Sequence, residues 1–287
     1  MMFGYADAFS RNIGWLTRAE QASLANKCVA IAGMGGVGGN HLLTLARLGV
    51  GRFHIADFDT FEIHNFNRQV GATVSHLGRS KVQVLAEMAR DINPELEIQS
   101  FPEGVTSANL PDFLSGIDLY VDGLDFFAFS ARQMTFDACA EAGVPVVTAA
   151  PLGMGAAVVN FMPGGMSFEE YFCWGKGTDE AKALRFLLGL APARLHFDYL
   201  VDSTSVNLKE RRGPSTFMAC QLCAGMAATE ALKILLGRGK VWAAPYSHQF
   251  DAYRNKLVRS WRPGGNRHPL QRMALRIAEG RLAKLNE

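Results

Sequence analysis

The sequence predicts an α/β fold: a doubly wound, mainly parallel, Rossmann-like sheet with a C-terminal helical and β-hairpin extension. Short apolar runs alternate with longer segments of helical spacing over residues 27–165, and such alternation is typical of a parallel sheet covered on both faces. The first apolar run leads directly into a glycine-rich turn. The alternation stops near residue 165, where we expect the extension to begin.

The first segment, residues 1–26, is predicted to be an N-terminal helical arm. Thr17 and Glu20 precede an apolar pattern with the spacing of a capping box, in which the two residues cap the start of a helix reciprocally. A helix is therefore expected directly after Thr17.

Residues 27–165 carry the alternating pattern and form the predicted Rossmann-like domain. Apolar runs of strand length with few polar interruptions are typical of strands buried on both faces. The expected strands are residues 28–33, 52–57, 96–101, 117–123 and 144–150. The segments with helical spacing between them are residues 41–49, 81–93 and 130–142.

Residues 166–287 form the predicted C-terminal extension. It begins with a loop-rich crossover segment and continues with a long apolar helix at residues 215–237, a hairpin and a basic terminal helix. The long helix is predicted to end at Gly237, because glycine readily adopts the left-handed conformation that closes helices.

The composition bounds the class of protein. The chain has 287 residues, 48% of them hydrophobic, and 29 Lys and Arg balance 27 Asp and Glu to give a net charge of +2. This excludes an intrinsically disordered chain and gives no sign of general attraction to nucleic acid or membranes. Five cysteines are too few for a disulfide scaffold, and the N-terminus lacks the pattern of a secretory signal. We expect a cytoplasmic protein with no membrane or nucleic-acid partner.

The glycine-rich turn predicts a bound adenine nucleotide. Gly33, Gly35, Gly36 and Gly38 lie between the first strand and the first helix, where bare backbone N–H groups can approach a phosphate at the positive end of the helix dipole. Asp57 ends the second strand, the place where an acid hydrogen-bonds a ribose hydroxyl. Asp59 is the alternative ribose ligand, and a merely tight strand–helix turn is the alternative to a nucleotide site.

Two cations favour ATP over NAD. Arg68 and Lys81 follow the second strand, and a triphosphate gains more from added cations than a dinucleotide whose phosphates already lie on helix N–H groups. An NAD(P)-dependent oxidoreductase built on the same glycine turn is the alternative enzyme, but it leaves Arg68 and Lys81 without a role.

A series of motifs in this part of the chain resembles the ThiF/MoeB/HesA family, relatives of the ubiquitin-activating enzymes. The motifs are G-x-G-G-x-G at 33–38, D-x-D at 57–59, N-x-N-R-Q at 65–69, G-x-x-K at 78–81 and D-G-x-D at 122–125. The resemblance runs from residue 9 to about residue 162. It implies an ATP-dependent adenylyltransferase, in which a carboxylate attacks the α-phosphorus of MgATP and gives an acyl-adenylate and pyrophosphate.

The resemblance also implies site residues and partners. The four glycines of the turn would contact the phosphates and Asp57 the ribose, while Asn65, Arg68 and Lys81 would hold the triphosphate and Asp125 the magnesium ion. Arg11 stands in a Phe-Ser-Arg-Asn stretch similar to a family element whose arginine reaches the partner subunit's site, so a homodimer is expected. The activated carboxylate would be the C-terminus of a ubiquitin-like or sulfur-carrier protein, a peptide or another carboxylate.

Two departures from the family and one cysteine leave parts of this interpretation open. Phe126 stands where the family usually has Asn, and the single C-x-x-C pair, Cys220 and Cys223, is half of the thiolate set of a structural zinc site, so no structural zinc is expected. Together they support a third hypothesis, a non-catalytic nucleotide-binding scaffold. Cys173 lies where some relatives capture the acyl group, with Lys176 nearby to favour a thiolate; a structural cysteine is the alternative.

Overall fold

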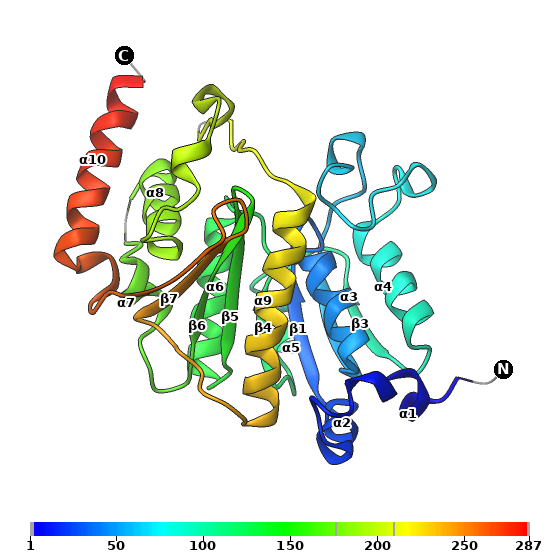
Figure 1. The fold of residues 1–287 in the computed structure, drawn as a ribbon. Helices are drawn as coiled ribbons and strands as arrows, with labels where there is room; N and C mark the ends of the chain where they lie inside the picture. The colour runs from blue at the N-terminus through cyan, green and yellow to red at the C-terminus, as the bar shows by residue number, and fades with distance from the viewer. Residues whose placement is uncertain (1–2, 176, 209, 286–287) are drawn as a thin grey trace.

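One eight-stranded sheet forms the frame of the protein (Figure 1). The computed structural model describes residues 3–175, 177–208 and 210–285. The strand order is β3-β2-β1-β4-β5-β6-β7-β8, and the first five strands in this order are parallel. The strands are β1 (Cys28–Ala32), β2 (Arg52–Ala56), β3 (Glu97–Phe101), β4 (Leu119–Asp122), β5 (Val146–Leu152), β6 (Gly155–Phe161), β7 (Tyr246–Asp251) and β8 (Lys256–Trp261). The predicted fold class is confirmed.

The sheet is buried on both faces, as the continuous apolar runs predict. In β1, Val29 and Ile31 face one hydrophobic cluster, and Ala30 and Ala32 face the other. Helices α3 (Gly38–Leu48), α4 (Lys81–Ile92) and α9 (Phe217–Leu236) cover the first face. Helices α5 (Leu110–Phe113), α6 (Phe129–Glu141), α7 (Phe168–Phe172) and α8 (Asp179–Leu190) cover the second.

The strand order reverses beside β1, whose neighbours are β2 and β4. In an open parallel sheet such a reversal leaves a crevice at the carboxyl ends of the strands, where ligands bind. The glycine turn follows β1 and therefore lies at this crevice.

The N-terminal arm lies at the end of the sheet where the parallel strands begin, opposite the crevice (Figure 1). It contains α1 (Tyr5–Ala8) and α2 (Arg18–Leu24), and the predicted capping box is present: Glu20 N–H donates to Thr17 Oγ1, and Thr17 N–H donates to Glu20 Oε2. Tyr5 Oη donates to the carbonyl of Gly49 (2.6 Å), just past the last turn of α3. Helix α3 starts at the glycine turn, at the carboxyl ends of the parallel strands, and runs back along the sheet. Its C-terminus therefore lies at the amino ends of these strands, which we call the amino edge (Figure 1).

The C-terminal extension adds to the same sheet. The predicted hairpin is β7 and β8, and β7 pairs with β6. Strand β6 was not predicted. It follows β5 after a turn of two residues, and in the sequence the two strands form one apolar stretch interrupted by proline and glycine. Helix α10 (Pro269–Leu285) packs on α8. Single-turn 3-10 helices are Ser10–Asn12, Ile63–Asn65, Val74–His76, Phe197–Tyr199, Ser203–Ser205 and Gly265–Arg267.

Helix α9 ends at Gly237 in the left-handed conformation (φ 59°), as predicted. Among the described residues it is the one helix whose length and composition would allow it to cross a membrane. It packs against α3, β5 and β6, and the core helix of a globular domain meets the same criterion.

Candidate active site

The glycine turn brings three elements into backbone contact. Gly33 has φ +86°, and a Cβ on it would overlap the carbonyl of Gly123 beyond β4. A Cβ on Gly38, the first residue of α3, would overlap the carbonyl of Gly33. Only glycine fits such contacts. Val37, the N-cap residue of α3, makes no side-chain capping hydrogen bond, and the first turn of a helix offers N–H groups that can bind an anion.

Asp57 ties the glycine turn to the end of β2. Its Oδ2 accepts from Met34 N–H (2.6 Å) and its Oδ1 from Asp59 N–H (2.8 Å). Burial raises the pKa of Asp57, while Lys81 and these two N–H groups oppose the rise. Each carboxylate oxygen can accept a second hydrogen bond, so the half-buried Asp57 can still take a ribose hydroxyl.

Lys81 is a buried cation at the same edge. It is the first residue of α4 and only 5% exposed, and its Nζ lies 2.8 Å from Oδ2 of Asp59. Asp59 itself is exposed. The alternative ribose ligand is thus the ion-pair partner of Lys81, and the pair places a desolvated ammonium group beside the crevice.

Arg68 lies where the glycine turn meets the start of α9. Its Nη1 donates to the carbonyl of His64 (2.7 Å) and to Oδ1 of Asn67 (3.1 Å). Asn67 Nδ2 donates to the carbonyl of Ser215 (2.9 Å), just before α9. A Cβ on Gly36 would lie 3.2 Å from the sulfur of Cys220 and 3.6 Å from Cγ of Arg68. Residues distant in sequence therefore surround Gly36.

Asn65 and Gln69 flank Arg68 in the chain and are both buried. Asn65 Oδ1 accepts from Glu62 N–H (3.0 Å), so this side chain shapes the loop. Gln69 lies with its amide 3.7 Å from the Cβ position of Gly35. Its Oε1 is buried with no hydrogen-bond partner among the described residues. Such an orphaned group at an open glycine cradle fits a ligand that supplies the missing contact.

Asp125 projects from the loop after β4 on the other side of the crevice. It is exposed, and its Oδ1 accepts from Phe127 N–H (3.0 Å). A carboxylate with a free oxygen suits Mg²⁺, which proteins hold through one or two carboxylates together with substrate phosphates. Phe126, at the position usually occupied by Asn, packs on Phe127 (5.0 Å) and Phe186 (5.3 Å).

Sequence reasoning missed the ion pair beneath this loop. Asp122 and Arg132 are both buried, with Arg132 Nε 2.9 Å from Asp122 Oδ2. Asp122 is the first residue of the D-G-x-D motif and could have been singled out, whereas Arg132 lies outside every motif.

Cys173 and Arg11 lie apart from the glycine turn. Cys173 ends α7 with φ 51°, and the next residue, Trp174, packs on Phe129 at the start of α6 (5.3 Å). Cys173 is thus on the Asp125 side of the crevice; Lys176 lies outside the described residues. Arg11 is exposed in the N-terminal arm, at the amino edge of the sheet.

The described residues contain no group of three or more His, Cys, Asp or Glu placed to hold a metal ion. Cys220 and Cys223 are buried in α9, and burial raises the pKa of both thiols. Burial therefore disfavours the thiolate, which is the form that binds zinc.

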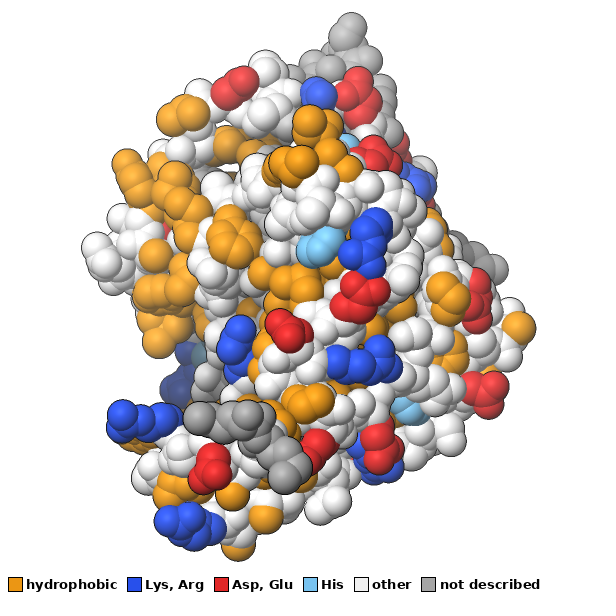
Figure 2. All heavy atoms as spheres, turned by 90° about the vertical axis from the view of Figure 1, so that its right-hand side faces the viewer, with side chains coloured by type: hydrophobic (Ala, Val, Ile, Leu, Met, Phe, Trp, Pro, Cys, Tyr) orange, Lys and Arg blue, Asp and Glu red, His pale blue; other side chains and the backbone are white. Residues whose placement is uncertain are grey.

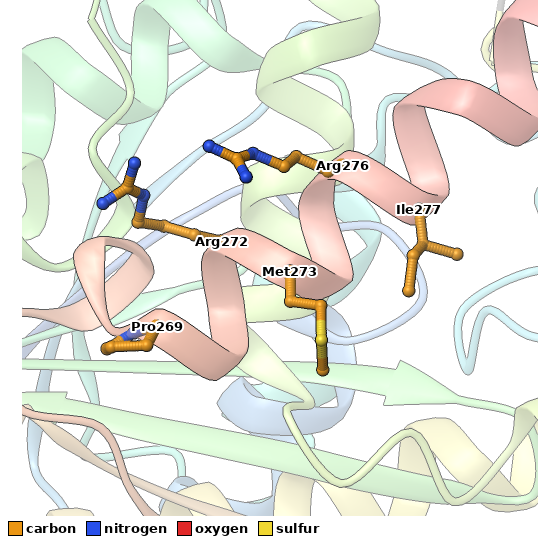
Figure 3. Close-up of a pocket in the computed structure, with 5 residues that line it drawn as sticks. All are labelled: Pro269, Arg272, Met273, Arg276 and Ile277. Carbon is orange, nitrogen blue, oxygen red and sulfur yellow. The ribbon is translucent and has the colours of Figure 1, made fainter.

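Two hollows lie elsewhere on the surface. One of about 780 Å³ runs along α9 and is mainly apolar; Met154, Met218, Leu222, Met226, Phe250 and Tyr253 contribute to its wall. The other, of about 340 Å³, lies on α10 between Arg272, Met273, Arg276 and Ile277 (Figure 3). Helix α10 is at the other end of the molecule from α3 (Figure 1).

Comparisons with known proteins agree with the motifs. The family profile described as "ThiF family" matches residues 9–273. Adenylyltransferase and sulfurtransferase MOCS3 of Arabidopsis thaliana is 36% identical over 134 residues, which are 47% of this chain and 28% of that protein. The tRNA threonylcarbamoyladenosine dehydratase of Bacillus subtilis is 34% identical over 150 residues, 52% of this chain and 57% of that protein. Both relatives extend well beyond the shared region.

Solved structures share the fold. PaaA superposes with a TM-score of 0.68 at 18% identity over 91% of this chain and 74% of that chain. E. coli MccB, in a structure with ATP, gives a TM-score of 0.66 at 18% identity over 88% of this chain and 70% of that chain. At this identity the likeness concerns the fold.

Proposed function

Because this chain belongs to the ThiF family, we propose that it is an ATP-dependent adenylyltransferase that activates a carboxylate. The observation that carries the proposal is the convergence of the uncapped glycine turn, Asp57, Arg68 and buried Lys81 at one end of the parallel strands. An anion-binding cradle with two added cations suits a nucleoside triphosphate.

In the proposed reaction a substrate carboxylate oxygen forms a bond to the α-phosphorus of ATP. The bond between the α-phosphorus and the bridging oxygen to the β-phosphate breaks, and pyrophosphate leaves with that electron pair. The protein positions the reactants and stabilises charge. Helix α3 N–H groups, Arg68 and Lys81 would take the phosphates and Asp57 the ribose. Asp125 would hold Mg²⁺, which neutralises charge on phosphate oxygens.

The relatives suggest which class of carboxylate this chain activates. MOCS3 is named an adenylyltransferase and sulfurtransferase, and MccB has been solved in complex with N-formylated MccA. We propose that this chain likewise activates a protein or peptide carboxylate, of the kind carried by ubiquitin-like or sulfur-carrier proteins.

We also propose a homodimer in which Arg11 completes the partner's site. Within one subunit Arg11 lies at the amino edge of the sheet, opposite the glycine turn, so only a second copy can bring it there. Exposed apolar side chains between β2 and α4 and at the start of α9 offer surface for such a contact. They include Phe58, Ile63, Phe66, Val74, Leu77 and Met218. Figure 2 shows the face that lies on the right-hand side of Figure 1, with hydrophobic side chains gathered along its left edge.

Ligand binding and pyrophosphate release test the proposal. Titration calorimetry is expected to show binding of MgATP and no comparable binding of NADH, and pyrophosphate release is expected with a panel of peptides that differ at the C-terminus. Tight NADH binding without MgATP binding would instead favour the oxidoreductase.

A further inference from the structure

We propose that Arg132 is a positioning residue that fixes the loop carrying Asp125, and thereby the metal-binding direction of that carboxylate. The inference rests on the proposed function. Arg132 is 2% exposed and belongs to α6, outside every motif of the sequence. It is therefore a residue whose role only the folded structure reveals.

The contacts of Arg132 converge on one short loop. Its Nη2 donates to the carbonyls of Leu124 (2.8 Å) and Asp125 (3.0 Å). Its Nη1 donates to the carbonyl of Phe126 (3.2 Å). A planar guanidinium presents its donors in a rigid fork, so three successive carbonyls are turned inward toward one group. The Asp125 side chain is left exposed on the outside of the loop.

The loop also fixes the Asp125 carboxylate from its other side. Phe127 N–H donates to Oδ1 of Asp125 (3.0 Å), so the backbone holds one oxygen. Within the described residues Oδ2 accepts no hydrogen bond and is free for a ligand. Mg²⁺ demands near-octahedral geometry, and groups that orient a metal ligand from behind strengthen metal binding.

Arg132 is itself held from two directions. Its Nε pairs with Asp122 at the end of β4, and Asp122 also accepts from Thr148 Oγ1 on β5 (2.7 Å). Its Cζ lies 4.5 Å from the ring centre of Phe186 on α8. A buried ion pair contributes little net stability, because desolvation offsets its attraction. A role in orienting the Asp125 loop accounts for its presence.

The test uses the variant Arg132→Lys. Lysine keeps a positive charge beside Asp122, but it lacks the guanidinium fork that reaches three carbonyls at once. Mn²⁺, as a stand-in for Mg²⁺, is titrated by electron paramagnetic resonance with the full-length protein and a non-hydrolysable ATP analogue. We expect Mn²⁺ binding to weaken roughly ten-fold, while binding of the analogue in EDTA stays unchanged. Arg185→Lys is the matched control, because Arg185 clamps the carbonyls of Cys173 (2.8 Å) and Trp174 (2.7 Å) in a different loop.

Equal Mn²⁺ affinity in Arg132→Lys, Arg185→Lys and the wild type would overturn the assignment. If Arg132→Lys does not fold, Thr148→Val replaces it, because this variant removes one hydrogen bond from Asp122. We expect Thr148→Val to weaken Mn²⁺ binding to a smaller degree. Unchanged Mn²⁺ binding in Thr148→Val would then overturn the assignment of Arg132. Wild-type protein that binds no Mn²⁺ with the analogue would overturn the proposed function as well, so the two failures are distinguishable.

Discussion

Arg68 stands at the meeting point of the glycine turn, the 57–81 segment and α9. We expect Arg68→Ala to weaken MgATP binding by roughly ten-fold or more, because hydrogen bonds to charged groups contribute about 1.5–3 kcal/mol. Titration calorimetry measures the change directly. Arg79→Ala is the control, since Arg79 belongs to the same segment but pairs with Glu87 (2.7 Å). Equal loss of affinity in both variants would remove Arg68 from the site.

Cys173 gives a second prediction at this scale. Adenylation needs no thiol, so Cys173→Ala is expected to retain ATP–pyrophosphate exchange at the wild-type rate even if the thiol accepts the acyl group afterwards. A variant that folds and binds ATP but has lost exchange would show that Cys173 acts in the first step.

Single residues were predictable where a motif names them and unpredictable where only the fold pairs them. Gly33 and Asp57 directly follow β1 and β2, and Lys81 begins α4, as predicted; their roles toward ATP stay predictions. The ion-pair partners of such residues could not be predicted from the sequence, because side-chain directions at the crevice depend on how the loops close. Lys81 pairs with Asp59, and Asp122 pairs with Arg132. Arg132 was missed for this reason.

At the scale of elements, the glycine turn is a close packing contact between the ends of β1 and β4 and the start of α3. We expect Gly38→Ala to cost about 1–3 kcal/mol of stability, as overpacking does, because the added methyl overlaps the Gly33 carbonyl. Gly280→Ala on α10 meets nothing within 4 Å and is expected to be neutral or to stabilise by up to about 1 kcal/mol. Urea denaturation measures both, and a harmless Gly38→Ala would contradict the close backbone contact.

The helices and strands of the parallel half were predictable because each has a strong local pattern. Helix α4 begins at Lys81 and ends before Asn93, as the Asn-Pro pair predicts. Strand β6 was missed, since Pro151 and Gly153 broke an apolar stretch whose two halves pair with each other. Antiparallel pairing of that kind depends on the turn between the strands, for which the apolar pattern gives no signal.

At the scale of the whole molecule, the homodimer makes a sharp prediction. Arg11→Ala and Arg68→Ala homodimers are each expected to lose most of their ATP–pyrophosphate exchange at MgATP concentrations that do not saturate the variants. Mixed subunits form heterodimers with one intact site, so random exchange is expected to restore about a quarter of the wild-type activity in a two-fold dimer. No recovery, with subunit exchange confirmed by mass spectrometry, would place Arg11 outside the partner's site.

The order of the sheet was predictable only in part. Alternating strands and helices predict a parallel half with a crevice at the switch beside β1. The addition of β7 and β8 to that sheet joins residues far apart in the chain, and no local pattern carries such pairing. The surroundings of Gly36, which include Cys220 of α9, could not be predicted for the same reason.

The central claim is that a carboxylate oxygen attacks the α-phosphorus of ATP at this crevice. The most direct test incubates the protein and MgATP with peptides whose C-terminal carboxylates carry ¹⁸O, and analyses the nucleotide products by mass spectrometry. After the acyl group is transferred or hydrolysed, the account predicts AMP that contains one ¹⁸O atom, together with pyrophosphate. ADP and phosphate as the products, or AMP without ¹⁸O, would contradict it.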